Sequence, residues 1–247
     1  MSKILFIFEG ESTEPTYFEA IKKYFKFEDD IISIFGGSIY QMYNCIQKDP
    51  ELDIFELVKE RECKRTNSPS PLKDVLRKDI SEIFIFFDHD GHDSNAASYK
   101  LKELLETFDE STEQGHLYIS YPMVESLIDI KLDNLEFKNK LALISQNKQY
   151  KKKTKENNKL THIGNISREQ WGRIFQENLK KANWIISENY ILPMKLGINQ
   201  YDIFNSQESK FIQPHGQVAI LSAYPLFIDD YFREEFLFYR NDVDYLP

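Results

Sequence analysis

The strongest constraint on the fold is an unbroken apolar run at residues 83–87, which leads directly into Asp-His-Asp-Gly-His-Asp at 88–93. Five consecutive apolar side chains predict a strand that is buried on both faces, because a strand with one solvated face would alternate apolar and polar residues. Strands of this kind are typical of parallel sheets that helices cover on both sides. The run therefore predicts an α/β fold with acidic residues at the end of a central strand.

A second apolar run, at residues 4–8, ends in a similar way at Glu9-Gly10-Glu11. In open parallel sheets the functional site lies just past the carboxyl ends of the strands. Right-handed crossover connections would bring the ends of these two strands to one rim of the sheet. We therefore expect Glu9, Asp88 and Asp90 to lie close together.

The rest of the first half alternates strand and helix patterns. Strands are expected at 3–8, 31–35, 82–88 and 116–120, and helices at about 14–26, 39–48, 51–63, 72–79 and 95–108. This order predicts a Rossmann-like parallel sheet of about four strands flanked by helices.

From about residue 132 the pattern changes to a mainly helical region. It contains a lysine-rich stretch at 148–159 and a long helix at 167–189, which Ser167 and Gln170 open as a reciprocal capping pair. We expect an α/β core at 1–131 and a mainly helical C-terminal region at 132–247.

Composition limits the classes of function only weakly. A formal net charge of −9 argues against nucleic-acid binding by the whole surface, but bound metal ions and a local basic patch would still permit a nuclease. No apolar run approaches the roughly 20 residues that span a bilayer, and no signal peptide precedes Lys3. Two cysteines, Cys45 and Cys63, are too few for a disulfide framework, so we expect reduced thiols in a cytoplasmic protein.

The acidic residues at the two strand ends predict a divalent-metal site. Asp88 and Asp90 would point to the same side of an extended segment, while His89 would point away. Neighbouring strands lie about 4.8 Å apart, so Glu9 could share an ion with them. Three such carboxylates would repel one another without a cation. The alternative is that these acidic residues only end strands and begin helices.

The segment Glu-Gly-Glu-Ser-Thr-Glu-Pro-Thr-Tyr-Phe at 9–18 resembles the opening signature of RloB-like proteins, a branch of the Toprim superfamily. Toprim domains carry a glutamate after their first strand and an Asp-x-Asp after their third, and they occur in topoisomerases, primases and OLD-type nucleases. The resemblance covers roughly residues 1–131. It implies a Toprim-like fold, with Glu9 as metal ligand or general acid/base and with Asp88 and Asp90 as the Asp-x-Asp pair.

The same resemblance suggests further candidate metal ligands. Tyr121 to Glu125 stands where RloB-like proteins have an Asn-Pro-x-x-Glu-like segment, which makes Glu125 an additional candidate ligand, although Tyr121 departs from asparagine. Glu14 is another candidate ligand, or a favourable charge in the first turn of a helix. His89 and His92 have no cysteine beside them and are not expected to bind zinc.

The lysine-rich stretch suggests contact with a phosphate backbone. Lys151, Lys152, Lys153 and Lys155 are the candidate nucleic-acid-binding residues, and a mobile, solvated loop is the alternative.

These features predict a Mg²⁺- or Mn²⁺-dependent phosphodiesterase, an endonuclease that acts on DNA or RNA. The resemblance implies an effector of bacterial anti-phage defence, with an ABC-type ATPase as a partner; a homo-oligomer is left open. No P-loop is present, so the chain is not its own P-loop ATPase. The alternatives are a non-catalytic Toprim-fold subunit, which binds metal, nucleic acid or a partner, and a small-molecule phosphohydrolase.

Overall fold

The computed structural model describes residues 2–49, 51–65, 70–131, 135–156, 160, 162–193 and 197–241, without the side chains of 135 and 233–241. It divides into two compact units. The first comprises Met1–Asp88 and Asp93–Tyr118, and the second comprises His89–His92 and Ile119–Pro247. The predicted boundary after residue 131 falls at 132–134, outside the described residues.

A mostly parallel five-stranded sheet confirms the predicted α/β fold. Its strands are β1 (Lys3–Phe8), β2 (Asp30–Ile34), β3 (Ile80–Asp88), β4 (Asp109–Glu110) and β5 (Gly115–Ser120), in the order β2-β1-β3-β5-β4. β1 pairs in parallel with both β2 and β3, as the apolar runs predict. The fifth strand, β4, is antiparallel to β5 and was not predicted, because two residues carry no periodicity.

Aromatic side chains line one face of the first unit's sheet. Phe6 and Phe84 lie 5.6 Å apart between ring centroids on neighbouring strands, and Phe8 and Phe86 lie 5.3 Å apart. Phe18 of α1 (Thr13–Lys22) packs on this row, 4.4 Å from the ring of Phe6. The two-residue period of the strands thus turns alternate residues of each run toward one helix, which explains why the runs contain so many phenylalanines.

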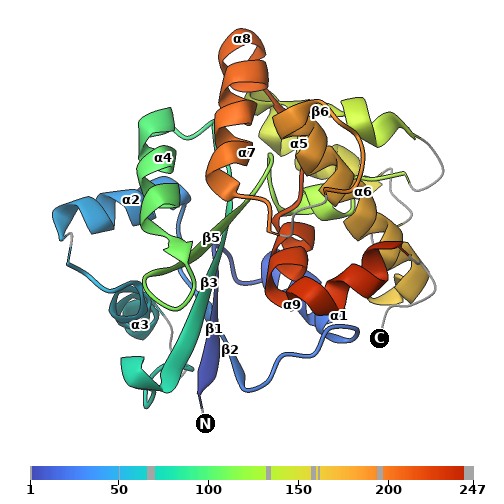
Figure 1. Cartoon of the computed structure of the whole chain (residues 1–247). Helices are drawn as coiled ribbons and strands as arrows, with labels where there is room; N and C mark the ends of the chain where they lie inside the picture. The colour runs from blue at the N-terminus through green and yellow to red at the C-terminus, as the bar shows by residue number, and fades with distance from the viewer. Residues whose placement is uncertain are drawn as a thin grey trace. The chain divides into compact units, whose positions relative to one another are not determined.

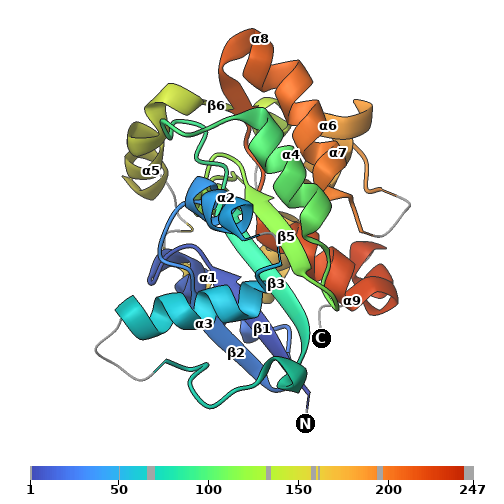
Figure 2. The same cartoon turned by 90° about the vertical axis from the view of Figure 1, so that its left-hand side faces the viewer.

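The opposite face of this sheet is covered by α2 (Ile39–Lys48), α3 (Ile54–Arg65) and α4 (Ser98–Thr107), as Figures 1 and 2 show. The buried carboxylate of Glu62 fixes α3, because it accepts hydrogen bonds from Ile34 N–H at 2.8 Å and from the Ser70 hydroxyl at 2.7 Å. The helix predicted at 72–79 is wrong in extent: only the 3₁₀ turn Arg77–Asp79 forms, just before β3.

The second unit is mainly helical, as expected for the C-terminal region. Its elements include β6 (Leu141–Leu143), α5 (Asn147–Glu156), α6 (Arg168–Ser187), α7 (Gln200–Gln207), α8 (Gln213–His215), β7 (Gln217–Ala219) and α9 (Ala223–Asn241). The predicted capping pair at the start of α6 is confirmed: Ser167 and Gln170 each accept a hydrogen bond from the other's backbone N–H. The π-helical segment Glu208–Ile212 joins α7 to α8 in one continuous rod (Figure 1).

Polar side chains fix the packing of the second unit at several buried points. The amide of Gln207 bonds to both the N–H and the carbonyl of Ala219, at 2.8 and 2.7 Å. The Asn178 side chain accepts a hydrogen bond from Ser222 N–H at 2.9 Å. Buried amides that are fully paired in this way specify one arrangement of the elements around them.

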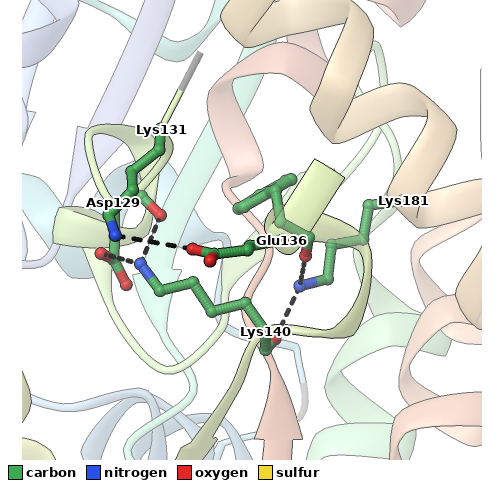
Figure 3. Close-up of polar contacts among 6 residues, drawn as sticks. Asp129, Lys131, Glu136, Lys140 and Lys181 are labelled. Atoms are coloured by element: carbon green, nitrogen blue, oxygen red, sulfur yellow. Dashed lines mark hydrogen bonds and ion pairs between the residues drawn. The ribbon is translucent and has the colours of Figure 1, made fainter. Parts of the chain in front are cut away.

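Another buried polar contact in the second unit is made by a lysine. Lys181 of α6 is fully buried, and its ammonium group donates to the carbonyls of Phe137 and Lys140, each at 2.7 Å (Figure 3). The Lys140 side chain, in turn, pairs with the Asp129 carboxylate. Burial, together with the charge of Lys140, lowers the pKa of Lys181 well below its ordinary value.

Two further expectations concern membrane-spanning helices and the state of the cysteines. Within the described ranges, no helix has both the length and the apolar composition that crossing a bilayer requires. Cys45 and Cys63 are both free thiols, as predicted.

The lowered pKa of Lys181 predicts a particular pH dependence of stability. As pH falls below the unfolded pKa of about 10.4, the unfolded chain takes up a proton that the folded chain does not, so Lys181 stabilises the fold less. Between about pH 8 and 10, the free energy of unfolding of the wild type should therefore rise relative to Lys181→Met, by at most about 1.4 kcal/mol per pH unit. Urea denaturation at several pH values measures this difference. Lys148→Met, at an exposed position of α5, is the control, and a pH-independent difference for Lys181→Met would contradict the prediction.

Candidate functional site

The structure places Glu9, which follows β1, beside the end of β3. In the parallel register Phe8 lies opposite Phe86, so β1 and β3 end side by side. Glu9 N–H donates to the Phe86 carbonyl at 3.2 Å, and one carboxylate oxygen of Glu9 accepts a hydrogen bond from Asp88 N–H at 3.0 Å. Both acidic side chains are partly exposed. The rim that the sequence predicts thus forms, in the first unit, around Glu9 and Asp88.

Glu14 lies against the same loop. A Cβ atom on Gly10 would come within 3.3 Å of a carboxylate oxygen of Glu14, so this side chain folds back over the residue that follows Glu9. Ser12, at the start of α1, makes no capping hydrogen bond with its side chain. Glu14 therefore supplies a negative charge both to the first turn of α1 and to the Glu9 loop.

The acidic segment turns sharply after Asp88, so the expectation that it stays extended is wrong beyond that residue. β3 ends at Asp88, and Asp90 adopts a left-handed backbone conformation with φ of 47°. Aspartate is one of the few residues that tolerate this region, because its short polar side chain can bond locally. A Cβ atom on Gly91 would lie 2.5 Å from Cε1 of His89, so the turn also requires glycine there. Asp90 is part of the second unit.

The two histidines of this segment have different surroundings in the second unit. His89 is buried, and its ring lies 5.4 Å from that of Tyr121 and 6.2 Å from that of Phe204. Burial, with a smaller contribution from His92, lowers the pKa of His89 to about 4, so its imidazole is neutral near pH 7. The more exposed His92 lies 3.0 Å from the Asn147 amide and 3.8 Å from a carboxylate oxygen of Asp90.

The donor set at the rim fits a hard divalent cation. Mg²⁺ binds carboxylate oxygens, keeps several of its waters and needs only one or two carboxylates per ion, which Glu9 and Asp88 can supply. Within the part of the chain that the structure describes, however, no group of three or more His, Cys, Asp and Glu side chains is arranged to hold a metal ion. An ion bound by these two carboxylates would therefore take water for the rest of its coordination.

Glu125, the candidate ligand that follows β5, has a different environment. Its side chain is fully buried, and the ammonium groups of Lys151 and Lys155 each lie 3.2 Å from Oε1. These lysines stand one helical turn apart on α5, about half exposed, and they provide the positive charge beside this carboxylate. Glu125 thus joins α5 to the 3₁₀ turn Val124–Leu127.

The lysine-rich stretch is helical over α5, rather than a solvated loop. All four lysines are exposed. Lys151 and Lys155 lie beside Glu125, and Lys152 lies 3.8 Å from Glu156. Residues 157–159 of the predicted basic stretch lie outside the described residues. Hydrophobic periodicity could not predict the pairing with Glu125, because this stretch is almost free of apolar residues. The four-residue spacing of Lys151 and Lys155 was the one signal that they share a helix face.

Comparisons with protein-family models, with curated proteins and with solved structures give no match for this chain.

The ion pairs of Glu125 predict a difference between two pairs of lysines on one helix. Replacing Lys151 and Lys155 with alanine should lower the free energy of unfolding by about 1–3 kcal/mol, because a buried carboxylate loses its compensating charges, which solvent already screens in part. Replacing the exposed Lys152 and Lys153 should change it by less than about 0.5 kcal/mol. Chemical denaturation of both double variants measures the effect.

Adding Glu125→Gln to the first double variant should restore part of the lost stability, because no buried charge then remains unpaired. Equal stability of the two double variants would contradict the role of Glu125.

Proposed function

We propose that this chain is a divalent-metal-dependent nuclease that cleaves phosphodiester bonds in DNA or RNA. The observation that carries the proposal is the hydrogen bond from Asp88 N–H to the Glu9 carboxylate, which joins the acidic ends of two parallel strands. The resemblance of residues 9–18 to RloB-like Toprim proteins supports the same chemistry. By that resemblance, we also propose an effector of anti-phage defence that acts with an ABC-type ATPase.

In the proposed site, Glu9 and Asp88 would hold a Mg²⁺ or Mn²⁺ ion. Asp90, two residues after Asp88, is a candidate ligand from the sequence alone. When bound, the ion supplies Lewis-acid stabilisation of charge on the phosphate. Glu9 would also hold or move a proton, a role for which the Asp88 N–H fixes the orientation of its carboxylate. Glu14 is a further candidate ligand because it lies against Gly10.

Glu125 is left out of the proposed metal site, because the ammonium groups of Lys151 and Lys155 lie beside it.

A second candidate is a non-catalytic subunit that uses the same fold to bind a partner or a nucleic acid. The observation that favours it is that no group of three ligating side chains was found among the described residues. The two candidates differ in one requirement: the nuclease must bind a divalent ion through Glu9 and Asp88.

Cleavage assays with matched variants test the nuclease. The purified chain is incubated with plasmid, single-stranded DNA and transfer RNA in Mn²⁺. Glu9→Gln keeps an oxygen to accept the Asp88 N–H but loses the charge, so we expect a loss of cleavage of at least about 100-fold without loss of the fold. Asp88→Asn should behave in the same way. Glu169→Gln, which removes an exposed carboxylate of α6, is the control and should keep full activity.

Metal binding is measured on the same proteins, because an effector that awaits a partner need not cut by itself. Mn²⁺ should raise the melting temperature of the wild type and of Glu169→Gln, but much less that of Glu9→Gln or Asp88→Asn. Cutting that persists in both site variants, or equal Mn²⁺ stabilisation of all four proteins, would reject the nuclease and leave the non-catalytic subunit.

A further inference from the structure

Two arginines of α3 lie over the turn that follows β2, in the first unit. Arg61 donates from Nε to the Phe35 carbonyl at 2.9 Å and from Nη2 to the Gly36 carbonyl at 3.2 Å, and its guanidinium lies 4.0 Å from the centre of the Phe35 ring. Arg65, one helical turn later, runs across the same turn: a Cβ atom on Gly36 would lie 2.9 Å from its Cδ. The glycine thus makes room for the side chain of Arg65.

This turn lies directly beside the Glu9 rim. Gly36 N–H donates to the Glu9 carbonyl at 3.0 Å, and Phe35 N–H donates to the Phe8 carbonyl at 2.8 Å. Arg65 forms an ion pair with Glu11, the second residue after Glu9. A positive charge therefore lies beside the turn that bonds to the Glu9 backbone, at the strand end that carries the proposed site.

The guanidinium groups of Arg61 and Arg65 differ in their hydrogen bonding. Two of the nitrogens of Arg61 are held by backbone carbonyls, so Arg61 fixes the turn. Nε of Arg65 is buried and has no hydrogen-bond acceptor among the residues that the structure describes, and its ionic partner, the Glu11 side chain, is 68% exposed. An exposed ion pair contributes little stability, whereas arginine binds phosphate oxygens with two parallel hydrogen bonds.

We propose that Arg65 binds a backbone phosphate of a polynucleotide beside the one that is cleaved. Glu11 holds the guanidinium in the free protein, and the phosphate replaces Glu11 when the strand binds. The proposal rests on the proposed nuclease function and names its substrate contact. It also explains how a chain with a net charge of −9 can hold a polyanion: the attraction is local, beside the acidic rim.

The test measures binding without catalysis. A short fluorescein-labelled oligothymidylate is titrated with the chain in EDTA, and fluorescence anisotropy is followed between about 50 and 200 mM salt. Arg65→Ala should weaken binding about tenfold and reduce the slope of log affinity against log salt by about 0.7, the value for one phosphate contact on a single strand. Arg65→Lys should give an intermediate affinity, because it keeps the charge without the paired hydrogen bonds.

A second variant makes an opposite prediction. Glu11→Gln removes the carboxylate that competes with the phosphate, so it should tighten binding severalfold, which damage to the fold would not do. Arg173→Ala, at a half-exposed arginine of α6 that pairs with Glu169, is the matched control and should bind as the wild type does. Wild-type affinity in Arg65→Ala, weaker binding in Glu11→Gln, or no binding by the wild type at low salt would each overturn the proposal.

Failure of this proposal is distinguishable from failure of the nuclease. If the Arg65 and Glu11 effects appear while Glu9→Gln leaves cleavage and Mn²⁺ binding unchanged, the phosphate contact stands and the catalytic assignment falls. If cleavage and Mn²⁺ binding require Glu9 while Arg65→Ala binds like the wild type, only the phosphate contact falls.

Discussion

The register of β1 is the constraint on which the candidate site depends. β1 lies between β2 and β3, with Phe8 opposite Ile34 on one side and Phe86 on the other. This pairing places Glu9 beside Asp88 in one direction and beside Gly36 in the other. A shift by one residue would turn the buried phenylalanine row toward the other face of the sheet, so hydrophobic packing also fixes the site.

Much of the first unit could be predicted from the sequence, since its apolar runs carry the information. Unbroken runs indicate buried parallel strands, and their polar ends place Glu9 and Asp88 at one rim. The position of Asp90 could not be predicted in this way, because its left-handed backbone depends on the packing of Gly91 against His89. The contact of Arg65 with the turn after β2 was missed for a similar reason: a charged residue near a helix end gives no periodic signal.

The second unit was harder to predict because many of its decisive contacts are polar. Gln207, Lys181 and Glu125 are buried, and each meets partners that are distant in the sequence. Hydrophobic periodicity predicts which helices exist, but it does not indicate which buried amide or charge will join them. The lysines of α5 illustrate this difference, since the same composition serves both ion pairing with Glu125 and an exposed face.

The position of β1 between β2 and β3 also affects how the chain can acquire its structure during synthesis. Although β1 is made first, it completes its pairing only after β3, which lies far along the chain, has left the ribosome. Until then, the apolar strand can pair only with β2 and keeps one edge open. Such non-local pairing slows folding, so the nascent chain would pass through a stage in which chaperones have a hydrophobic strand to bind.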